Sequence, residues 1–275
     1  MVVNGSEMSK LNLDYVVNGF WNEYGDPRTF SMPIINGGPW KVFTIVICYL
    51  LFVKVFGPIF MKNRPPFDLR EVMLLHNSFL IGVNGVGTFV GLWVTDWGSK
   101  TFDCSPPEKQ DKFDIKISIL IWLGWIYFMT KIVDFMDTIF FVLRRKDHQA
   151  SFLHIFHHGS MPLVAYFGLK FHPGPYSAFL PIFNCFIHFI MYIYYAMACA
   201  GPSMKKFLWW KKQLTQIQIV QFMATIVHAS YAFFTDGCHY PRLLAFLEGM
   251  HATIFLVMFL KFYYRTYTRA PKKVM

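Results

Sequence analysis

Charged residues are scarce in this 275-residue sequence. They make up only 15% of the chain, whereas hydrophobic residues make up 55% and the mean hydropathy is +0.36. Soluble domains of this length rarely carry so little charge, because their surfaces face water. The deficit excludes an ordinary soluble domain and predicts a polytopic membrane protein.

Acidic residues are scarcer than basic residues. The chain has 16 Asp and Glu against 26 Lys and Arg, which gives a formal net charge of +10. The basic residues occur in short pieces between apolar runs, a placement typical of the cytosolic flanks of membrane spans. We therefore expect no nucleic acid among the partners and expect the lipid bilayer to be one.

Two other patterns are missing. Residues 1–38 lack the basic start and apolar core of a cleavable signal peptide, so we expect the first span to direct insertion. The alternating polarity of an outer-membrane barrel is missing too. Apolar stretches long enough to cross about 30 Å of hydrocarbon recur instead. They lie near residues 40–60, 72–94, 116–143, 151–169, 176–199, 213–235 and 242–264.

Each of these stretches is predicted to be a helix, because a helix satisfies its own backbone hydrogen bonds in lipid. The prediction is an all-α polytopic membrane protein with about seven transmembrane helices, forming a single integral-membrane domain over residues 1–275.

Lys and Arg are divided unevenly among the connections. The richer connections are 61–71, 144–150 and 200–212, together with the tail, whereas the opposite set contains Lys100, Lys109, Lys112 and Lys170. The positive-inside rule then predicts a lumenal N-terminal segment, 1–39, and a cytosolic tail, 265–275. Asn4 begins an Asn-Gly-Ser glycosylation sequon, which would need the lumenal side.

Only five cysteines are present. Cys104 and Cys238 fall in two connections predicted to be lumenal, where thiols oxidise readily, and we expect them to form a disulfide. The alternative is a pair of unrelated loop thiols. The other three cysteines, Cys48, Cys185 and Cys199, lie within or at the edge of apolar spans.

Polar residues inside spans are costly and therefore need a reason. In the segment 131–138, Lys131, Asp134, Asp137 and Thr138 share one arc of about 120° on a helix. Lys131 and Asp134 are three residues apart and can form a structural ion pair. Asp137 has no well-spaced partner in its own helix and is expected to serve another helix.

A second segment, which opens with Gln149, contains three histidines. His154, His157 and His158 are spaced i, i+3 and i+4, so they share one helix face. Neutral imidazoles at this spacing can hold a transition metal. They can equally act as base or nucleophile, because their pKa lies near neutrality.

Two later spans carry further polar residues. Asn184, His188 and Tyr192 lie on one face, with Tyr195 close behind. A membrane-interface belt would explain the tyrosines but not an Asn and a His near the middle of a span. Gln218 and Gln221 lie on one side of another span, where they suit either hydrogen bonding between helices or contact with substrate.

Together, the four segments resemble the very-long-chain fatty acid elongase (ELO) family of 3-ketoacyl-CoA synthases. The family patterns are KxxExxDT, QxxxLHxxHH, NxxxHxxMYxYY and TxxQxxQ, and the chain reads, in the same order, KIVDFMDT, QASFLHIFHH, NCFIHFIMYIYY and TQIQIVQ. Asp134 stands where the family usually has Glu. Leu153 resembles the branch that acts on long saturated, monounsaturated and polyunsaturated acyl-CoAs. Lys272 and Lys273 resemble a dilysine retrieval signal of the endoplasmic reticulum.

The resemblance implies a six-helix bundle or barrel around an acyl channel, with one peripheral helix, in the endoplasmic reticulum membrane. It implies condensation of a long-chain acyl-CoA with malonyl-CoA to 3-ketoacyl-CoA, CoA and CO2, without a cofactor or a metal. The reductases and the dehydratase of the elongation cycle are implied partners, and a homo- or hetero-oligomer is compatible with it.

Site residues follow from the matching positions. The expected catalytic residues are His154, His157, His158, His188, Asp137 and Asn184. The expected substrate-binding residues are Lys131, Asp134, Gln149, Tyr192, Tyr195, Gln218, Gln221, Lys205, Lys206 and Arg265. No cysteine lies in a motif beside the histidines, so an acyl-imidazole on His157 or His188 is the expected covalent intermediate.

Two other functions suit parts of the pattern. A membrane di-iron desaturase or hydroxylase also carries HxxHH, but needs several such boxes, and this chain has one box and 10 His in total. A seven-helix receptor or transporter would share the expected topology, but it explains neither the histidine cluster nor the short loops.

Overall fold

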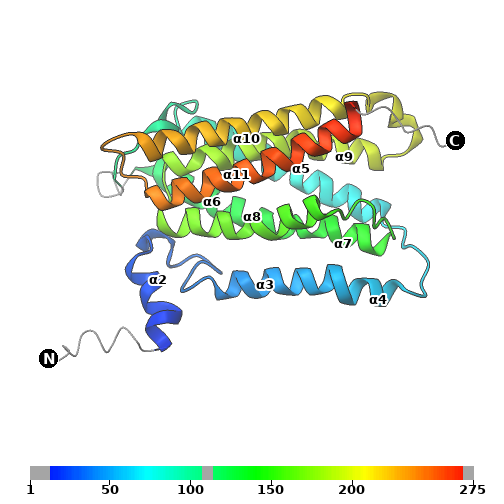
Figure 1. Cartoon of the computed structure of the whole chain (residues 1–275), viewed down its shortest axis with the longest axis horizontal. Coiled ribbons are helices and arrows are strands. Elements are labelled where there is room, and N and C mark those ends of the chain that lie inside the picture. Colours follow the sequence, from blue (N-terminus) through cyan, green and yellow to red (C-terminus); the bar gives the residue numbers. More distant parts are fainter. Residues whose placement is uncertain (1–12, 107–113, 269–275) are drawn as a thin grey trace. The chain divides into compact units, whose positions relative to one another are not determined.

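The computed structural model describes residues 13–106 and 114–268, and all regular structure within them is helical. Figure 1 shows long helices joined by short connections. Asn4 of the sequon and the two lysines of the predicted retrieval signal, Lys272 and Lys273, lie outside the described residues, as do Lys109 and Lys112.

Six helical segments of the described chain are long and apolar enough to cross a membrane. They are Trp40–Met61, Arg70–Val94, Ile115–Leu143, Tyr176–Cys199, Lys211–Phe234 and Arg242–Thr268. The remaining predicted span forms α8, Phe152–Phe171, whose 20 residues extend about 30 Å. Helix α8 carries three histidines and Lys170 and is not among these six segments. The chain is thus an all-α polytopic membrane protein, and the side on which each terminus lies stays a prediction.

The helices fall into two compact units, each built from two stretches of sequence. Unit 1 comprises Met1–Pro66 and Asp111–Ser177, and unit 2 comprises Phe67–Gln110 and Ala178–Met275. The short helix η6, Tyr176–Ala178, spans the last boundary between them.

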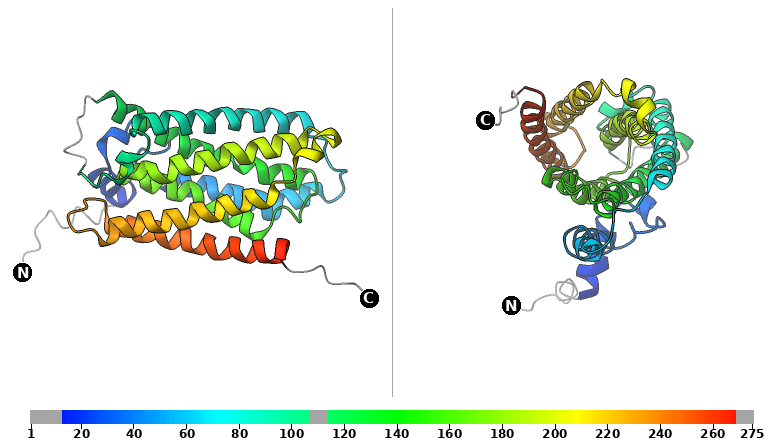
Figure 2. Two further views of the ribbon diagram at one scale, coloured as in Figure 1. Left: turned by 90° about the horizontal axis from the view of Figure 1, so that it is seen from above. Right: turned by 90° about the vertical axis from the view of Figure 1, so that its right-hand side faces the viewer.

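Unit 1 contains three long helical segments that run side by side (Figure 2). The first consists of α3 (Trp40–Leu51), η3 (Phe52–Phe56) and α4 (Gly57–Met61), and the second of α6 (Ile115–Val133) and α7 (Phe135–Leu143). The third, α8, packs against α6 and α3, while α4 packs against α7. A Cβ on Gly57 would lie 2.7 Å from Val142 Cγ1, so glycine is needed for this close approach.

The first described residues of unit 1 form three short helices. They are η1 (Tyr15–Gly19), α2 (Phe20–Glu23) and η2 (Pro27–Thr29). The segment 25–38 packs on the C-terminal end of α8. There Lys170 is fully buried, its Nζ donates to the Ile35 carbonyl at 3.3 Å, and it lies 4.6 Å from the centre of the Phe30 ring. The buried lysine therefore anchors this segment as a cap on one end of unit 1.

Unit 2 contains four long helices with short helical turns between them. They are α5 (Arg70–Val94), η4 (Ser99–Phe102), α9 (Phe179–Cys199), η7 (Pro202–Phe207), α10 (Lys211–Phe234), α11 (Arg242–Tyr263) and η8 (Tyr264–Thr268). Helix α9 packs against α5 and α10, and α10 packs against α11. Gly87 faces Cys185 and Gly91 faces Ile182, where an added Cβ would lie 3.2 and 2.7 Å from the neighbouring side chain. These glycines let α5 and α9 pack closely.

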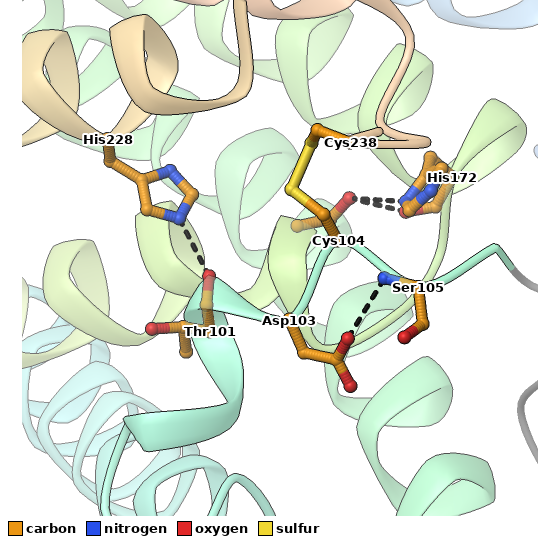
Figure 3. The surroundings of a disulfide bond; sticks show 8 residues. Thr101, Asp103, Cys104, Ser105, His172, His228 and Cys238 are labelled. Carbon is orange, nitrogen blue, oxygen red and sulfur yellow. Dashed lines mark hydrogen bonds between the residues drawn. A yellow bond between two sulfur atoms is a disulfide. The ribbon is translucent and has the colours of Figure 1, made fainter. Parts of the chain in front are cut away.

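A disulfide between Cys104 and Cys238 fastens one end of unit 2 (Figure 3). It joins the connection after η4 to the connection between α10 and α11, and the backbone N–H of His239 donates to the Cys104 carbonyl at 3.0 Å. Beside it, hydrogen bonds from Ser105 hold the pKa of the Asp103 carboxyl below its usual range. The bridge closes a span of 134 residues in sequence.

Candidate active site

A buried ion pair marks the junction between α6 and α7 in unit 1. Lys131 Nζ lies 2.9 Å from Asp134 Oδ2, and the two side chains are 1% and 3% exposed. Lys131 Nζ also lies 4.9 Å from the centre of the Tyr127 ring. Asp134 sits between the end of α6 at Val133 and the start of α7 at Phe135, so the predicted continuous helix is interrupted at this residue. The pair therefore lies at the junction of the two helices.

A chain of hydrogen bonds crosses three helices of unit 1. The Tyr49 hydroxyl of α3 lies 2.9 Å from Thr138 Oγ1 of α7, and the same Oγ1 lies 2.9 Å from His154 Nε2 of α8. Thr138 is fully buried, Tyr49 is nearly so, and the Tyr49 ring stacks on Phe135 at 4.0 Å. This chain fixes one nitrogen of the first histidine, and it includes a residue, Tyr49, that the sequence motifs do not contain.

The three histidines of α8 lie together, as their spacing predicts. The His154 and His158 rings are 4.1 Å apart between centroids, and the His157 and His158 rings are 5.6 Å apart. His158 is buried, whereas His154 and His157 are half-buried. The helix begins just before them, because the Ser151 side chain accepts a hydrogen bond from the backbone N–H of His154. Gln149 lies exposed in the connection that precedes this cap.

Asp137, the motif carboxylate of α7, is buried one residue before Thr138. We predicted that it is catalytic and serves another helix. The neighbouring Thr138 hydroxyl lies 2.9 Å from His154 Nε2 of α8. A role for Asp137 toward the other imidazoles stays a prediction.

In unit 2, the motif residues of α9 form a buried face. Asn184, His188 and Tyr192 are 4%, 6% and 0% exposed. The His188 and Tyr192 rings are 5.8 Å apart between centroids, and Tyr195 lies 5.9 Å beyond Tyr192. His76 of α5 approaches Tyr192 edge-on at 6.1 Å. Burial of Asn184 and His188 fits the interpretation that they do not belong to an interface belt.

Helix α5 and its C-cap residue Thr95 carry a buried polar stripe that the sequence motifs miss. Asn77, Asn84, Thr88 and Thr95 are each 5% exposed or less. Asn84 Nδ2 donates to the Leu80 carbonyl at 2.8 Å, while its Oδ1 finds no hydrogen-bond donor among the described residues. Only the seven-residue spacing of Asn77 and Asn84 could have indicated this stripe.

The glutamines of α10 face the interior of unit 2 to different degrees. Gln221 is buried, and its backbone carbonyl accepts a hydrogen bond from Thr225. Gln218 is half-buried and its Nε2 lies 3.8 Å from Met191 Sδ of α9. The contact with α9 supports hydrogen bonding between helices for Gln218 and leaves contact with substrate a prediction.

Three of the basic residues predicted to bind substrate lie at one end of unit 2. Lys205 and Lys206 are exposed on η7, which leads into α10, and Arg265 is exposed on η8. Helix η8 lies beside the first turn of α10, because the Tyr267 hydroxyl lies 3.5 Å from the Lys211 carbonyl. This end therefore presents several cations together.

Within the described ranges, 13–106 and 114–268, no three His, Cys, Asp or Glu side chains are grouped as the ligands of a metal ion would be. The histidines of α8 belong to unit 1 and His188 belongs to unit 2. Each unit thus has its own imidazole face.

Comparison with known proteins agrees with the four motif segments. The model of the "ELO: GNS1/SUR4 family" matches residues 34–275. A "very long chain fatty acid elongase" of Aedes aegypti is 40% identical over 256 residues, which cover 92% of this chain and 70% of the relative. "Very long chain fatty acid elongase 7" of Drosophila melanogaster is 37% identical, covering 90% and 74%. "Very long chain fatty acid elongase 1" of Mus musculus is 33% identical, covering 91% and 89%.

The family match extends over nearly all of the described helices and includes every histidine of both imidazole faces. The matches to elongases argue against the desaturase and receptor interpretations. The chain belongs to the GNS1/SUR4 (ELO) family.

Proposed function

We propose that the protein performs the condensing step of fatty acid elongation through an acyl-imidazole intermediate on His157 or His188. It is a 3-ketoacyl-CoA synthase, an acyltransferase that joins a long-chain acyl-CoA to malonyl-CoA. The observation that carries the proposal is the set of clustered imidazoles on α8, one of which is held by the Thr138 hydroxyl. A fixed imidazole beside others is a suitable arrangement for a nucleophile and its helpers.

The reaction has two stages. In the first, an imidazole nitrogen attacks the acyl thioester, a C–N bond forms, the C–S bond breaks, and CoA leaves as the thiol with the imidazole proton. In the second, malonyl-CoA loses CO2, and the resulting enolate carbon attacks the acyl-imidazole carbonyl. The C–N bond then breaks, and the imidazole takes up a proton as 3-ketoacyl-CoA forms.

The motif residues have distinct proposed roles in these stages. His154 is a supporting imidazole, because its Nε2 is engaged by Thr138. His158 polarises the malonyl thioester or stabilises the enolate. Asp137 accepts the N–H of one imidazole, and Asn184 donates to an oxyanion.

Binding of the two CoA substrates is proposed for the basic end of unit 2. Phosphate groups require cations, and Lys205, Lys206 and Arg265 are exposed there. Gln149, Tyr192, Tyr195, Gln218 and Gln221, together with the pair Lys131 and Asp134, are proposed to contact or shape the substrate path. No cofactor is proposed beyond the two CoA substrates.

The proposed location is the endoplasmic reticulum membrane, with the N-terminus lumenal and the C-terminus cytosolic. The disulfide supports this orientation, because Cys104 and Cys238 then face the oxidising side. The exposed lysines of η7 and Arg265 then face the cytosol, where acyl-CoA and malonyl-CoA are supplied. Reductases and a dehydratase that complete the cycle are the proposed partners.

The test uses purified protein with radiolabelled malonyl-CoA and acyl-CoAs of graded length from palmitoyl-CoA upward. We expect labelled 3-ketoacyl-CoA, and its loss in both His157→Ala and His188→Ala. Incubation with acyl-CoA alone, followed by mass spectrometry, should find the acyl mass on a peptide that contains one of these histidines. Activity retained in both variants would overturn the assignment.

A matched control separates imidazole from thiol chemistry. Cys185 lies on α9 next to Asn184, and its Sγ would lie 3.2 Å from a Cβ at Gly87, so it packs between α5 and α9. Cys185→Ala should keep the condensing activity. An acyl group found on Cys185, with activity lost in the alanine variant, would replace the acyl-imidazole by a thioester.

A further inference from the structure

The first described residues form a helix with one apolar and one polar side. Leu13, Val16, Phe20 and Tyr24 follow one another at intervals of three, four and four residues, and are 76%, 49%, 40% and 57% exposed. We call these four residues the outer stripe. The interval places them along one side of the helix. Large apolar side chains in such a row are not left in water without a reason.

The opposite side of this helix is polar, and its side chains form hydrogen bonds with one another. Asn18 Nδ2 donates to Asp14 Oδ1 at 3.1 Å, and the Tyr15 hydroxyl donates to Glu23 at 2.5 Å. Asn22 lies exposed on the same side. Residues 13–24 include Asp14 and Glu23 but no Lys or Arg. Attraction to anionic lipid headgroups therefore does not explain the exposed apolar row.

A third edge of the helix joins it to the membrane-spanning part of unit 1. The Trp21 ring lies 5.9 Å from Phe171 of α8 and 6.5 Å from Trp40, the first residue of α3, and Trp40 Nε1 donates to the Val17 carbonyl at 3.1 Å. Phe20 of the outer stripe contacts Trp21 at 5.2 Å. The helix is thus fastened at the level where the first span begins.

The outer stripe is continuous with the lipid-facing side of that span. From Phe20 the row of aromatic rings passes through Trp21 and Trp40 to Phe43, whose ring is 6.3 Å from that of Trp40. Trp40 and Phe43 are 45% and 37% exposed, as expected for side chains that face lipid. Figure 1 and the right view of Figure 2 show the helix of residues 13–23 lying across the axis of α3. A helix lying across a transmembrane helix at its end runs along the membrane surface.

We propose that residues 13–24 form an interfacial helix that docks its outer stripe into the acyl-chain boundary of the bilayer, at the end of unit 1 where α3 begins. The partner is a lipid surface, recognised by burial of apolar side chains rather than by headgroup charge. The docked helix holds the next segment, 25–38, against the end of α8, where Lys170 anchors it. This inference rests on the membrane character of the chain and is independent of the condensing chemistry.

The test measures depth in the full chain, reconstituted in phosphatidylcholine nanodiscs. A nitroxide is attached to Phe20→Cys on the outer stripe and, as the matched control, to Asn22→Cys on the polar side, in a background with Cys48→Ala and Cys199→Ala. Each protein is first shown to elute as a single folded species. The label at position 20 should collide more often with oxygen, which dissolves in lipid, than with a water-soluble nickel complex. The label at position 22 should show the reverse.

Three outcomes would overturn the proposal. Equal preference for the nickel complex at both positions would mean that the stripe faces water. Spin–spin coupling between labels at position 20 would mean that a second copy of the chain covers the stripe. A deeper label at position 20 when phosphatidylserine is added would mean that headgroup charge, rather than apolar burial, drives docking. If Phe20→Cys fails to fold, Val16→Cys reports on the same stripe.

Discussion

The two units bury their polar side chains in different ways. In unit 1, side chains bond to one another: across three helices in the chain from Tyr49 through Thr138 to His154, and at the junction of α6 and α7 in the pair of Lys131 with Asp134. In unit 2, many hydroxyls and amides of the spans bond back to the carbonyl four residues earlier in their own helix. Examples are Asn84 to Leu80, Thr88 to Asn84, Thr95 to Gly91 and Thr225 to Gln221.

Hydrogen bonds within one helix and hydrogen bonds between helices have different structural effects. A bond within one helix satisfies a polar group but fixes nothing between helices. A bond between helices sets the position and rotamer of both partners, which a reacting imidazole needs. The comparison predicts that unit 1 is more sensitive than unit 2 to loss of single polar groups, and the following variants test it from the largest expected effect to the smallest.

The buried ion pair should show the largest effect. Lys131→Met leaves the Asp134 carboxylate buried without its ammonium partner, and we expect a loss of about 3–5 kcal/mol in the free energy of unfolding. The double variant Lys131→Met, Asp134→Leu should recover most of that loss, because neither charge then remains. Thermal unfolding in detergent micelles measures both. A double variant as unstable as the single one would contradict this account.

The disulfide should come next. Replacing Cys104 and Cys238 by Ser should cost unit 2 about 2–4 kcal/mol, because the unfolded chain regains the freedom of a long loop. The control is the wild-type protein unfolded with and without a reductant, which should reproduce the difference. An unchanged midpoint in both comparisons would show that the bridge contributes little.

The bond between helices in unit 1 should have a smaller but specific effect. Thr138→Val keeps the shape of the side chain and removes the hydroxyl that joins Tyr49 to His154, and we expect a loss of about 1–3 kcal/mol together with a fall in kcat. Thr88→Val in unit 2 is the matched control, because its hydroxyl donates to the Asn84 carbonyl within α5. It should cost less than about 1 kcal/mol and leave kcat unchanged. Equal effects of the two variants would remove the distinction between the units.

Replacement of Asn84 should have the smallest effect on the free energy of unfolding, and it should not lower that free energy. Asn84 Oδ1 is buried without a donor in the described chain, so Asn84→Leu should leave the free energy of unfolding unchanged or raise it by about 1 kcal/mol. Thermal unfolding of Asn84→Leu beside Asn77→Leu measures this. A loss of stability at Asn84 would show that the amide has a partner in the folded protein.

Much of this arrangement follows from the sequence. The long apolar runs predict six of the long helical segments, and the three- and four-residue spacing of His154, His157 and His158 brings their rings together. Lys131 and Asp134 pair as their spacing predicts. These features are local, so the periodicity of one helix contains them.

What the sequence does not reveal depends on contacts between distant segments. Tyr49 is one aromatic residue in an apolar run, and only the fold brings it to Thr138, 89 positions away. The cap of residues 25–38 depends on a buried Lys170 that reads as an ordinary loop lysine. Arg145 likewise caps α4 by donating to the carbonyl oxygens of Met61 and Lys62. No local sequence pattern predicts this contact.

The interleaving of the two units has a consequence for biosynthesis. Helix α5 leaves the ribosome before α6, α7 and α8, yet its packing partner α9 follows all of them. During translation, the side of α5 that carries its glycines and buried asparagines therefore has no packing partner until α9 has been synthesised. Likewise, Cys104 cannot form its disulfide until Cys238 has been synthesised. Formation of that bond thus marks a late point in assembly, at which a cell can distinguish a finished chain from an unfinished one.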